Sequence, residues 1–205
     1  MYLSKIHIHW RLGGNHYHLH QALWKLFTGR SDNPRDFLYR VERMGKGNGM
    51  FILLQSTKCP QQTENGPVIL DWREINPGFV SGQRLRFRLR ANPVKRIKDS
   101  QKGTVEKKGK TYTRTLRVPL LHEEQQQAWL ERKFQDMAQL ETLIIQPEPV
   151  LYFRKEKEKR SGKIQTVLFD GILRITNPEA FAHTFKTGIG PAKAFGCGLL
   201  SIAKT

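Results

Sequence analysis

The amino-acid sequence predicts an α+β protein made of two tandem ferredoxin-like (RRM-like, βαββαβ) domains. Segments with apolar residues at every second position alternate with segments at helical spacing, and their order reads as β-α-β-β-α-β twice. The 205 residues also suffice for two compact domains of about 100 residues each. We therefore expect an N-terminal domain at residues 1–80 and a C-terminal domain at residues 84–205. The second copy is the clearer one, because the first shows no convincing second helix.

The N-terminal half is expected to begin with a strand followed by a helix. The strand is Tyr2–Arg11, and its apolar face consists of Ile6, Ile8 and Trp10. The helix is His16–Phe27 with Asn15 as its N-cap, and its apolar stripe consists of Leu19, Ala22, Leu23 and Leu26. Three strands follow, separated by a glycine-rich turn at 45–49 and a polar loop at 60–66; we expect them at 37–42, 50–56 and 68–75.

The C-terminal half repeats this order with a cleaner pattern. Its first strand is Leu85–Ala91, and a basic, polar segment without predicted structure follows at Lys95–Lys110. The remaining elements are a helix at Glu123–Gln139, strands at Thr142–Arg154 and Lys163–Thr176, a helix at Pro178–Lys186 capped by Asn177, and a strand at Gly198–Ala203.

The charge of the chain indicates a polyanionic partner. Lys plus Arg number 35 against 18 acidic residues, which gives a net charge of +17. Nucleic acid is the first candidate and an anionic membrane surface the second. The membrane interpretation lacks a run of about 18 apolar residues, a lipidation motif or a signal peptide. The two cysteines, Cys59 and Cys197, form no Cys-x-x-Cys pair, so we expect a reduced, cytoplasmic setting.

The first helix carries a candidate catalytic pair. Tyr17 and His20 are spaced i and i+3, so they are neighbours on a face that also holds Trp24 and differs from the main apolar stripe. The alternative is that His20 is a surface or second-interface histidine. Histidines at 16, 18 and 20 also suggest a metal site, but His18 points away from the other two on a helix and no nearby carboxylate or cysteine completes a site. We expect no metal and no cofactor.

Three further patterns are candidate RNA contacts. The first predicted strand of the second half alternates four arginines with apolar residues, which places Arg84, Arg86, Arg88 and Arg90 on one face. Such a row suits a phosphate backbone, or else it is a solvated face relieved by scattered carboxylates. The segment 154–163 is a basic hairpin tip containing Lys159, Arg160 and Lys163, where the alternative is an ordinary solvated loop.

The third pattern is a glycine-rich stretch before the last strand. Glycines permit close backbone approach and aim N–H groups at an anion, whereas the alternative is a tight chain reversal. The stretch is neither a Walker A loop nor a dinucleotide fingerprint. Its candidate contact residues are Gly188, Gly190, Lys193, Gly196 and Gly198.

In combination, these segments resemble a known family. The glycine-rich stretch is similar to the C-terminal signature of the RAMP superfamily, and Tyr17 and His20, followed by Leu23 and Trp24, resemble the catalytic helix of its CasE branch. The CasE family comprises the repeat-processing endoribonucleases of type I-E Cascade. Further matching segments are Met1–Lys5, Phe87–Pro93, Ser161–Val167 and Gly188–Lys193.

The resemblance implies a metal-independent endoribonuclease. Its substrate would be the stem-loop repeat of precursor CRISPR RNA, cut at the 3′ base of the stem by attack of a 2′-OH. The products would carry a 2′,3′-cyclic phosphate and a 5′-OH. The protein would then keep the mature crRNA and join the other Cascade subunits.

Roles for individual residues follow from the same resemblance. His20 would transfer a proton, as acid at the leaving oxygen or as base at the 2′-OH, and Tyr17 would orient the 2′-OH or the phosphate. Lys163 or Arg160 would stabilise the phosphorane. A non-catalytic RNA-binding RAMP subunit is the alternative. A two-histidine phosphoesterase is excluded because no histidine has Ser or Thr two residues later.

Overall fold

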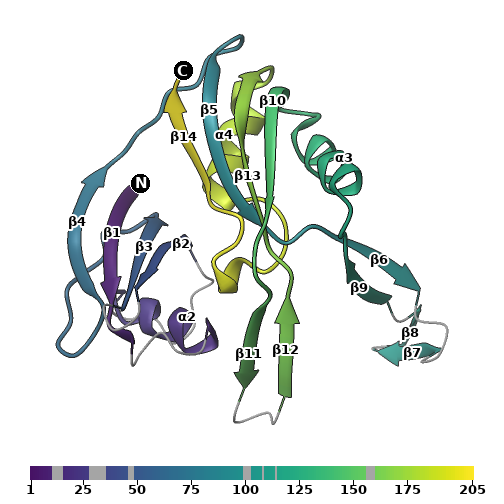
Figure 1. The fold of residues 1–205 in the computed structure, drawn as a ribbon, viewed down its shortest axis with the longest axis horizontal. Coiled ribbons are helices and arrows are strands. Elements are labelled where there is room, and N and C mark those ends of the chain that lie inside the picture. The colour runs from purple at the N-terminus through teal and green to yellow at the C-terminus, as the bar shows by residue number, and fades with distance from the viewer. Residues whose placement is uncertain are drawn as a thin grey trace.

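The computed structural model describes residues 1–10, 16–27, 36–45, 49–98, 103–107, 109–113, 115–155 and 160–205. Two four-stranded antiparallel sheets form its centre, and two-stranded hairpins extend from the second sheet (Figure 1). Asn15, the expected cap of the first helix, lies outside the described residues, as do Lys159 and the centre of the 45–49 turn.

The first sheet has the strand order β2-β3-β1-β4. Its strands are β1 (Tyr2–Ile8), β2 (Phe37–Gly45), β3 (Gly49–Ser56) and β4 (Val68–Glu74). Helix α2 (His16–Trp24) covers one face and ends three residues before the predicted end at Phe27. The predicted stripe of Leu19, Ala22, Leu23 and Leu26 is buried, with Leu26 just beyond the helix. Residues 57–67, all described, contain no helix between β3 and β4. This sheet therefore carries one helix where the βαββαβ pattern has two.

The second sheet has the equivalent order, β10-β13-β5-β14, and carries both helices. Its elements are β5 (Arg84–Ala91), β10 (Ala138–Pro147), β13 (Val167–Ile175), β14 (Leu200–Lys204), α3 (Glu123–Phe134) and α4 (Pro178–Thr187). In both sheets the first strand lies between the third and the fourth, and all pairs are antiparallel. The predicted α+β fold with tandem ferredoxin-like domains is confirmed.

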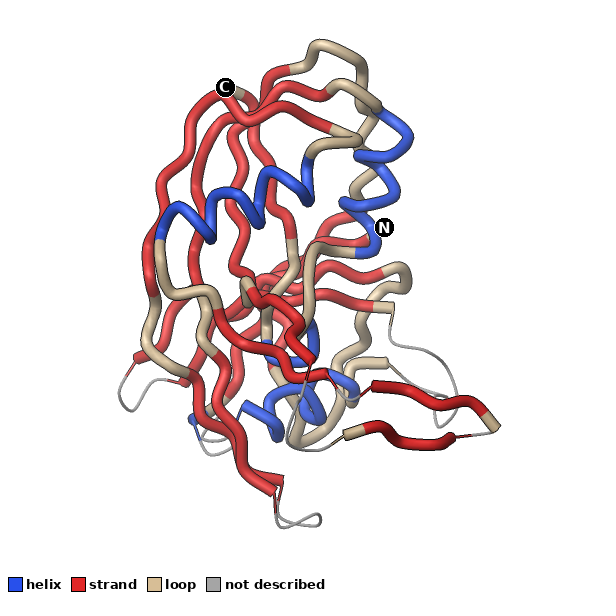
Figure 2. The backbone as a smooth tube through the Cα atoms, turned by 90° about the vertical axis from the view of Figure 1, so that its right-hand side faces the viewer, coloured by secondary structure: helices blue, strands red, loops and turns tan. Residues whose placement is uncertain are grey.

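Two insertions distinguish the second sheet. Between β5 and α3 the chain forms an arm of two short ladders, made of β6 (Val94–Lys98), β7 (Thr104–Lys107), β8 (Lys110–Thr113) and β9 (Thr115–Pro119). Between β10 and β13 it forms a hairpin of β11 (Leu151–Lys155) and β12 (Arg160–Ile164). Figure 2 shows paired strands reaching beyond the rest of the backbone.

Several predicted boundaries were wrong, each for a tertiary reason. The first strand ends at Ile8, because its partners β3 and β4 end there too, and Trp10 is exposed. The helix predicted at Glu123–Gln139 ends at Phe134, because Ala138 already pairs with Ile175 of β13.

Two further predictions differ from the structure in the course of the strands. The segment predicted to lack structure, Lys95–Lys110, contributes to the paired strands of the arm. The strands predicted at Thr142–Arg154 and Lys163–Thr176 are each interrupted, at residues 148–150 and 165–166. Pro147 and Pro149 have no amide hydrogen to donate to a ladder, which accounts for the first of these breaks.

The two sheets meet through hydrogen bonds from the first sheet to the second. The Tyr39 hydroxyl donates to the carbonyl of Ala194 (2.8 Å), and the buried Gln55 side chain donates to the carbonyl of Phe185 (2.9 Å). The buried Arg40 guanidinium donates to the carbonyl of Arg88 (3.1 Å). These bonds hold β2 and β3 against α4, the glycine-rich segment and β5.

Candidate active site

Helix α2 presents His20 against an aromatic cluster. The ring of His20 lies 5.6 Å from the ring of Phe37 and 6.1 Å from that of Trp24, measured between centroids. His20 and Tyr17 are half-buried, and the Nε2 atom of His20 is shielded from solvent. The helix face that carries Tyr17 and His20 is therefore also packed against the protein, because Phe37 of β2 contacts His20 there.

The structure brings the predicted site elements together. Helix α2 contacts strand β11 and the short 3₁₀ helix η1 (Lys193–Phe195) in the glycine-rich segment. Strand β11 is in turn fixed to η1, since the rings of Phe153 and Phe195 lie 4.5 Å apart. The α2 helix, the basic hairpin and the glycine-rich segment thus converge on one region, although more than 120 residues separate α2 from the hairpin in sequence.

Lys163 lies on β12 at the base of the basic hairpin. Its side chain is exposed and lines a pocket of 290 Å³, together with Phe153, Phe195 and Arg117. Next to it, Gly162 leaves room for Phe153, because an added Cβ would come within 2.4 Å of that ring. The backbone of Arg160 begins β12, whereas its side chain, like all of Lys159, lies outside the described part of the chain.

Arg84, Arg86 and Arg88 of β5 are exposed and alternate with buried apolar residues as predicted, whereas Arg90 is buried. Carboxylates neutralise most of the row. Arg84 forms an ion pair with Glu141, and Arg90 forms one with Glu148. Arg88 binds Asp170 through two hydrogen bonds of 2.7 and 3.1 Å. The hydrogen bond from Arg84, reinforced by Arg174, lowers the pKa of Glu141. Arg86 is exposed and has no carboxylate partner among the described residues.

Sequence reasoning missed the environment of two titratable side chains, Arg40 and His16. Arg40 bonds to Glu42 (2.7 Å) while also bonding to β5, and burial lowers its pKa. Burial, followed by the charge of Arg90, likewise lowers the pKa of His16, which places the start of α2 in the electrostatic field of the second sheet. The strand pattern of residues 37–42 gives no sign that Arg40 points inward, because only the facing sheet buries it.

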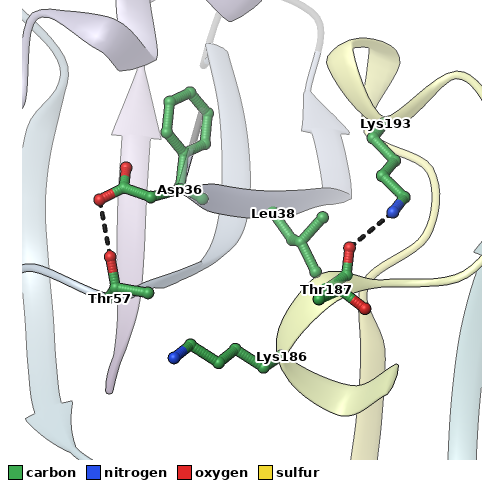
Figure 3. Close-up of a pocket in the computed structure, with 7 residues that line it drawn as sticks. Asp36, Leu38, Thr57, Lys186, Thr187 and Lys193 are labelled. Carbon is green, nitrogen blue, oxygen red and sulfur yellow. Dashed lines mark hydrogen bonds between the residues drawn. The ribbon is translucent and has the colours of Figure 1, made fainter. Parts of the chain in front are cut away.

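The glycines of residues 188–198 permit close packing. Gly188, Gly190, Gly196 and Gly198 all have φ between +77° and +92°. A Cβ on Gly188 would lie 2.7 Å from Leu38 of the first sheet. Figure 3 shows the ammonium of Lys193 bonded to the carbonyl of Thr187 (2.6 Å), beside a pocket of 340 Å³ between β2 and α4. The tight chain reversal that formed the alternative interpretation is therefore present at these positions.

Three further observations concern the buried thiol, metal binding and membrane spans. Cys197 is buried, and its burial raises the pKa of the thiol to about 12. No group of three His, Cys, Asp or Glu side chains placed to hold a metal ion occurs among the described residues. No helix in the described part of the chain is long and apolar enough to cross a membrane.

Comparisons with known proteins match this architecture along the whole chain. A family model described as CRISPR associated protein matches residues 1–204. The CRISPR system Cascade subunit CasE of Escherichia coli K12 is 43% identical over 203 residues, covering 99% of both chains. The CRISPR-associated endoribonuclease Cse3 of Thermus thermophilus is 32% identical over 204 residues, covering 92% of this chain and 90% of that protein.

Solved structures of related proteins also match the fold of this chain over nearly its whole length. The crystal structure of Cas6e from E. coli K-12 superposes with a TM-score of 0.83 at 41% identity, covering 100% of both chains. T. thermophilus Cse3 bound to an RNA representing a pre-cleavage complex has a TM-score of 0.77 at 28% identity, covering 98% of both chains. The fold and the converging site thus define a CRISPR-associated protein with tandem ferredoxin-like domains. Within that class the chain belongs to the CasE/Cse3 family.

Proposed function

We propose that this chain is a metal-independent endoribonuclease that cuts the stem-loop repeat of precursor CRISPR RNA. The carrying observation is the packing of α2, with Tyr17 and His20, against β11 and η1, beside the pocket that contains Lys163. Membership of the CasE/Cse3 family, with relatives named as an endoribonuclease and a Cascade subunit, supports the same activity.

The chemistry assigned to the site is attack of a 2′-OH on the adjacent phosphate at the 3′ base of the stem. The O2′–P bond forms as the P–O5′ bond breaks, which leaves a 2′,3′-cyclic phosphate and a 5′-OH. One proton leaves the 2′-OH and one reaches the 5′-oxygen, and His20 performs one of these transfers. Lys163 stabilises the extra negative charge of the phosphorane, and Tyr17 positions the 2′-OH or the phosphate.

RNA binding in this proposal comes mainly from the second domain. Arg86, Arg160, Lys159 and Lys193 offer cations. Arg84, Arg88 and Arg90 contribute only in part, because carboxylates already compensate their charge. The backbone at Gly188, Gly190, Gly196 and Gly198 approaches the RNA closely. We assign residues 1–80 to the domain of the catalytic helix and residues 84–205 to the RNA-holding domain.

After cleavage the protein retains the mature crRNA and becomes a subunit of Cascade. Its E. coli relative is named as a Cascade subunit, which supports the second step. The proposal includes a cytoplasmic location, which the two free cysteines support.

Single-turnover cleavage of a repeat stem-loop RNA in EDTA tests this proposal. Wild type should cut at one site, and His20→Ala should be slower by at least about 10²-fold, the scale of one acid–base group, with binding retained. The His18→Ala variant, an exposed neighbour on the same helix, is the matched control and should cut normally. Binding without cutting by wild type would instead favour the non-catalytic RNA-binding subunit.

A further inference from the structure

Strand β4 is an open edge of the first sheet that carries apolar side chains. It stands last in the order β2-β3-β1-β4, and no strand among the described residues pairs with its outer side (Figure 1). Val68, Leu70 and Trp72 are 47%, 52% and 49% exposed. An uncovered edge strand with apolar side chains is a template for pairing with a further strand. The edge of β4 therefore favours the addition of a strand from another chain.

Hydrogen-bonding directions show which residues of β4 face the open side. The amide of Ile75 donates to the carbonyl of Met1 (2.8 Å), in the same register that continues along β1 and β4. Because these directions alternate along an antiparallel strand, the N–H and C=O groups of Trp72 and Glu74 point away from β1. An added strand can therefore hydrogen-bond to this part of β4.

The first part of β4 is less available for pairing. The side-chain oxygen of Gln62 accepts a hydrogen bond from the amide of Ile69 (2.9 Å), which occupies that donor. Next to it, the register between β1 and β4 shifts, which leaves Leu70 as a bulge. Regular pairing is therefore restricted to a short segment around Trp72.

The charges on either side of Trp72 are self-complementary. Asp71 and Arg73 are exposed and lie on the opposite face of the strand from Trp72. When two copies of β4 pair antiparallel with Trp72 opposite itself, Asp71 of each copy lies opposite Arg73 of the other. Opposite charges across a strand pair stabilise it. Lys5 competes little for Asp71, because the two charges are 3.9 Å apart and their side chains are 71% and 68% exposed.

Neighbouring registers lack this complementarity. A shift by two residues in one direction places Arg73 opposite itself, and a shift in the other direction places Asp71 opposite itself, so that like charges meet. A shift by one residue would turn the side chains of the two copies to opposite faces. The complementary register also makes Trp72 a hydrogen-bonded pair, in agreement with the direction of its backbone groups.

We propose that β4 is a homodimer interface, through which two copies of this chain join their first sheets edge to edge with Trp72 on the two-fold axis. The same strand segment serves both copies, as a closed two-fold dimer requires. Two four-stranded sheets become one continuous sheet, and the exposed Trp72 side chains contact each other across the axis. One short strand pair is a small interface, so the dimer forms in a concentration-dependent way.

Sedimentation velocity of the full-length protein tests the proposal over a series of concentrations up to about 1 mM, which also reveals weak association. At an ionic strength of about 0.15 M the Debye length is about 8 Å, so the net charge of each copy is largely screened. Wild type should shift from monomer to dimer as its concentration rises. A wild type that stays monomeric throughout would overturn the proposal and leave the edge to a strand of a different protein.

Charge reversal separates this edge from any other contact between copies. Asp71→Arg should weaken dimerisation by about tenfold, because two attractive pairs become repulsive, and Arg73→Asp should do the same. The double variant Asp71→Arg/Arg73→Asp has the net charge of wild type and restores both pairs in reversed order, so it should dimerise again. An equimolar mixture of the two single variants should form a heterodimer, because each supplies the charge that the other lacks.

The apolar contribution has its own matched pair of variants. Trp72→Thr keeps a residue that favours strands and should weaken dimerisation, whereas Val80→Thr, at an exposed valine outside the sheets, should not. Melting temperatures measured on dilute, monomeric protein show whether each variant is folded. A dimer that withstands both single charge reversals and Trp72→Thr would assign association to another surface and would overturn the proposal.

Discussion

The two four-stranded sheets have the same strand order but differ in what their connections contain. The described residues that connect the strands of the first sheet include one helix, α2, and the irregular segment 57–67. The second sheet carries two helices, the β6–β9 arm, the β11–β12 hairpin and the glycine-rich segment. Each sheet buries an apolar core of its own. The core of the second sheet includes residues of α3, α4 and the glycine-rich segment, but no described residue of the β6–β9 strands or of the β11–β12 hairpin.

This difference indicates that the two domains have different roles, with the first suited to chemistry and the second to binding. The first sheet holds a helix whose histidine is set against Phe37 and Trp24, which suits a group that must keep one orientation. The second sheet supplies exposed cations on extended strands, which suit a long polyanion. We therefore expect substitutions in α2 to affect chemistry and substitutions in the insertions to affect binding, with Lys163 as the one residue of the second domain that serves both.

The largest effect is expected from replacing Lys163, which tests whether a residue of the second domain takes part in the chemistry. Lys163→Met should slow single-turnover cleavage by about 10²–10³-fold, the usual cost of removing one group that stabilises transition-state charge. Lys163→Arg should recover part of the rate, and Lys204→Met, at an exposed lysine on β14, should leave it unchanged. The double variant His20→Ala/Lys163→Met should lose less than the product of the two single effects, because the residues act as a unit. A normal rate for Lys163→Met would confine the chemistry to the first domain.

A smaller effect is expected where the two sheets meet. Arg40→Met removes the bonds to Glu42 and to the Arg88 carbonyl in a buried position, so the free energy of unfolding should fall by about 1–3 kcal/mol. Urea denaturation measures it. Arg43→Met on the same strand is the control, since Arg43 is exposed beside the ring of Phe51 and should cost less than about 1 kcal/mol. Equal effects of the two variants would mean that the sheets do not depend on Arg40.

The smallest effect concerns pH. Burial and Arg90 lower the pKa of His16, so at pH values between this lowered pKa and about 6.5 the unfolded chain binds more protons than the folded one. The contribution of His16 to stability is therefore complete above a pH of about 6.5 and is lost as the pH falls below it. His16→Gln should reduce the drop in Tm between about pH 7 and about pH 5.5, a range that spans the ordinary histidine pKa. If the variant keeps the full wild-type drop, other groups are responsible.

Much of the fold could be predicted because single segments carry their own signals. Helix α2 has its buried stripe at the predicted positions, and Asn177 caps α4 by accepting a hydrogen bond from the amide of Ala180 (3.1 Å). The alternation of β5 places Leu85, Phe87 and Leu89 in the core. The arm escaped prediction because β6 and β9 pair with each other and are mostly exposed, so polar and basic residues replace the usual apolar period.

By itself the sequence determined the βαββαβ order, the basic character, the helix carrying Tyr17 and His20, and the family to which these residues point. Periodicity and motifs are local properties, so they can be recognised in the amino-acid sequence alone. Only the tertiary structure decided which arginines of β5 are neutralised and that Arg40 is buried. Those outcomes depend on which side chains from distant segments meet, because the energy of a charge is set by its neighbours and its exposure to water.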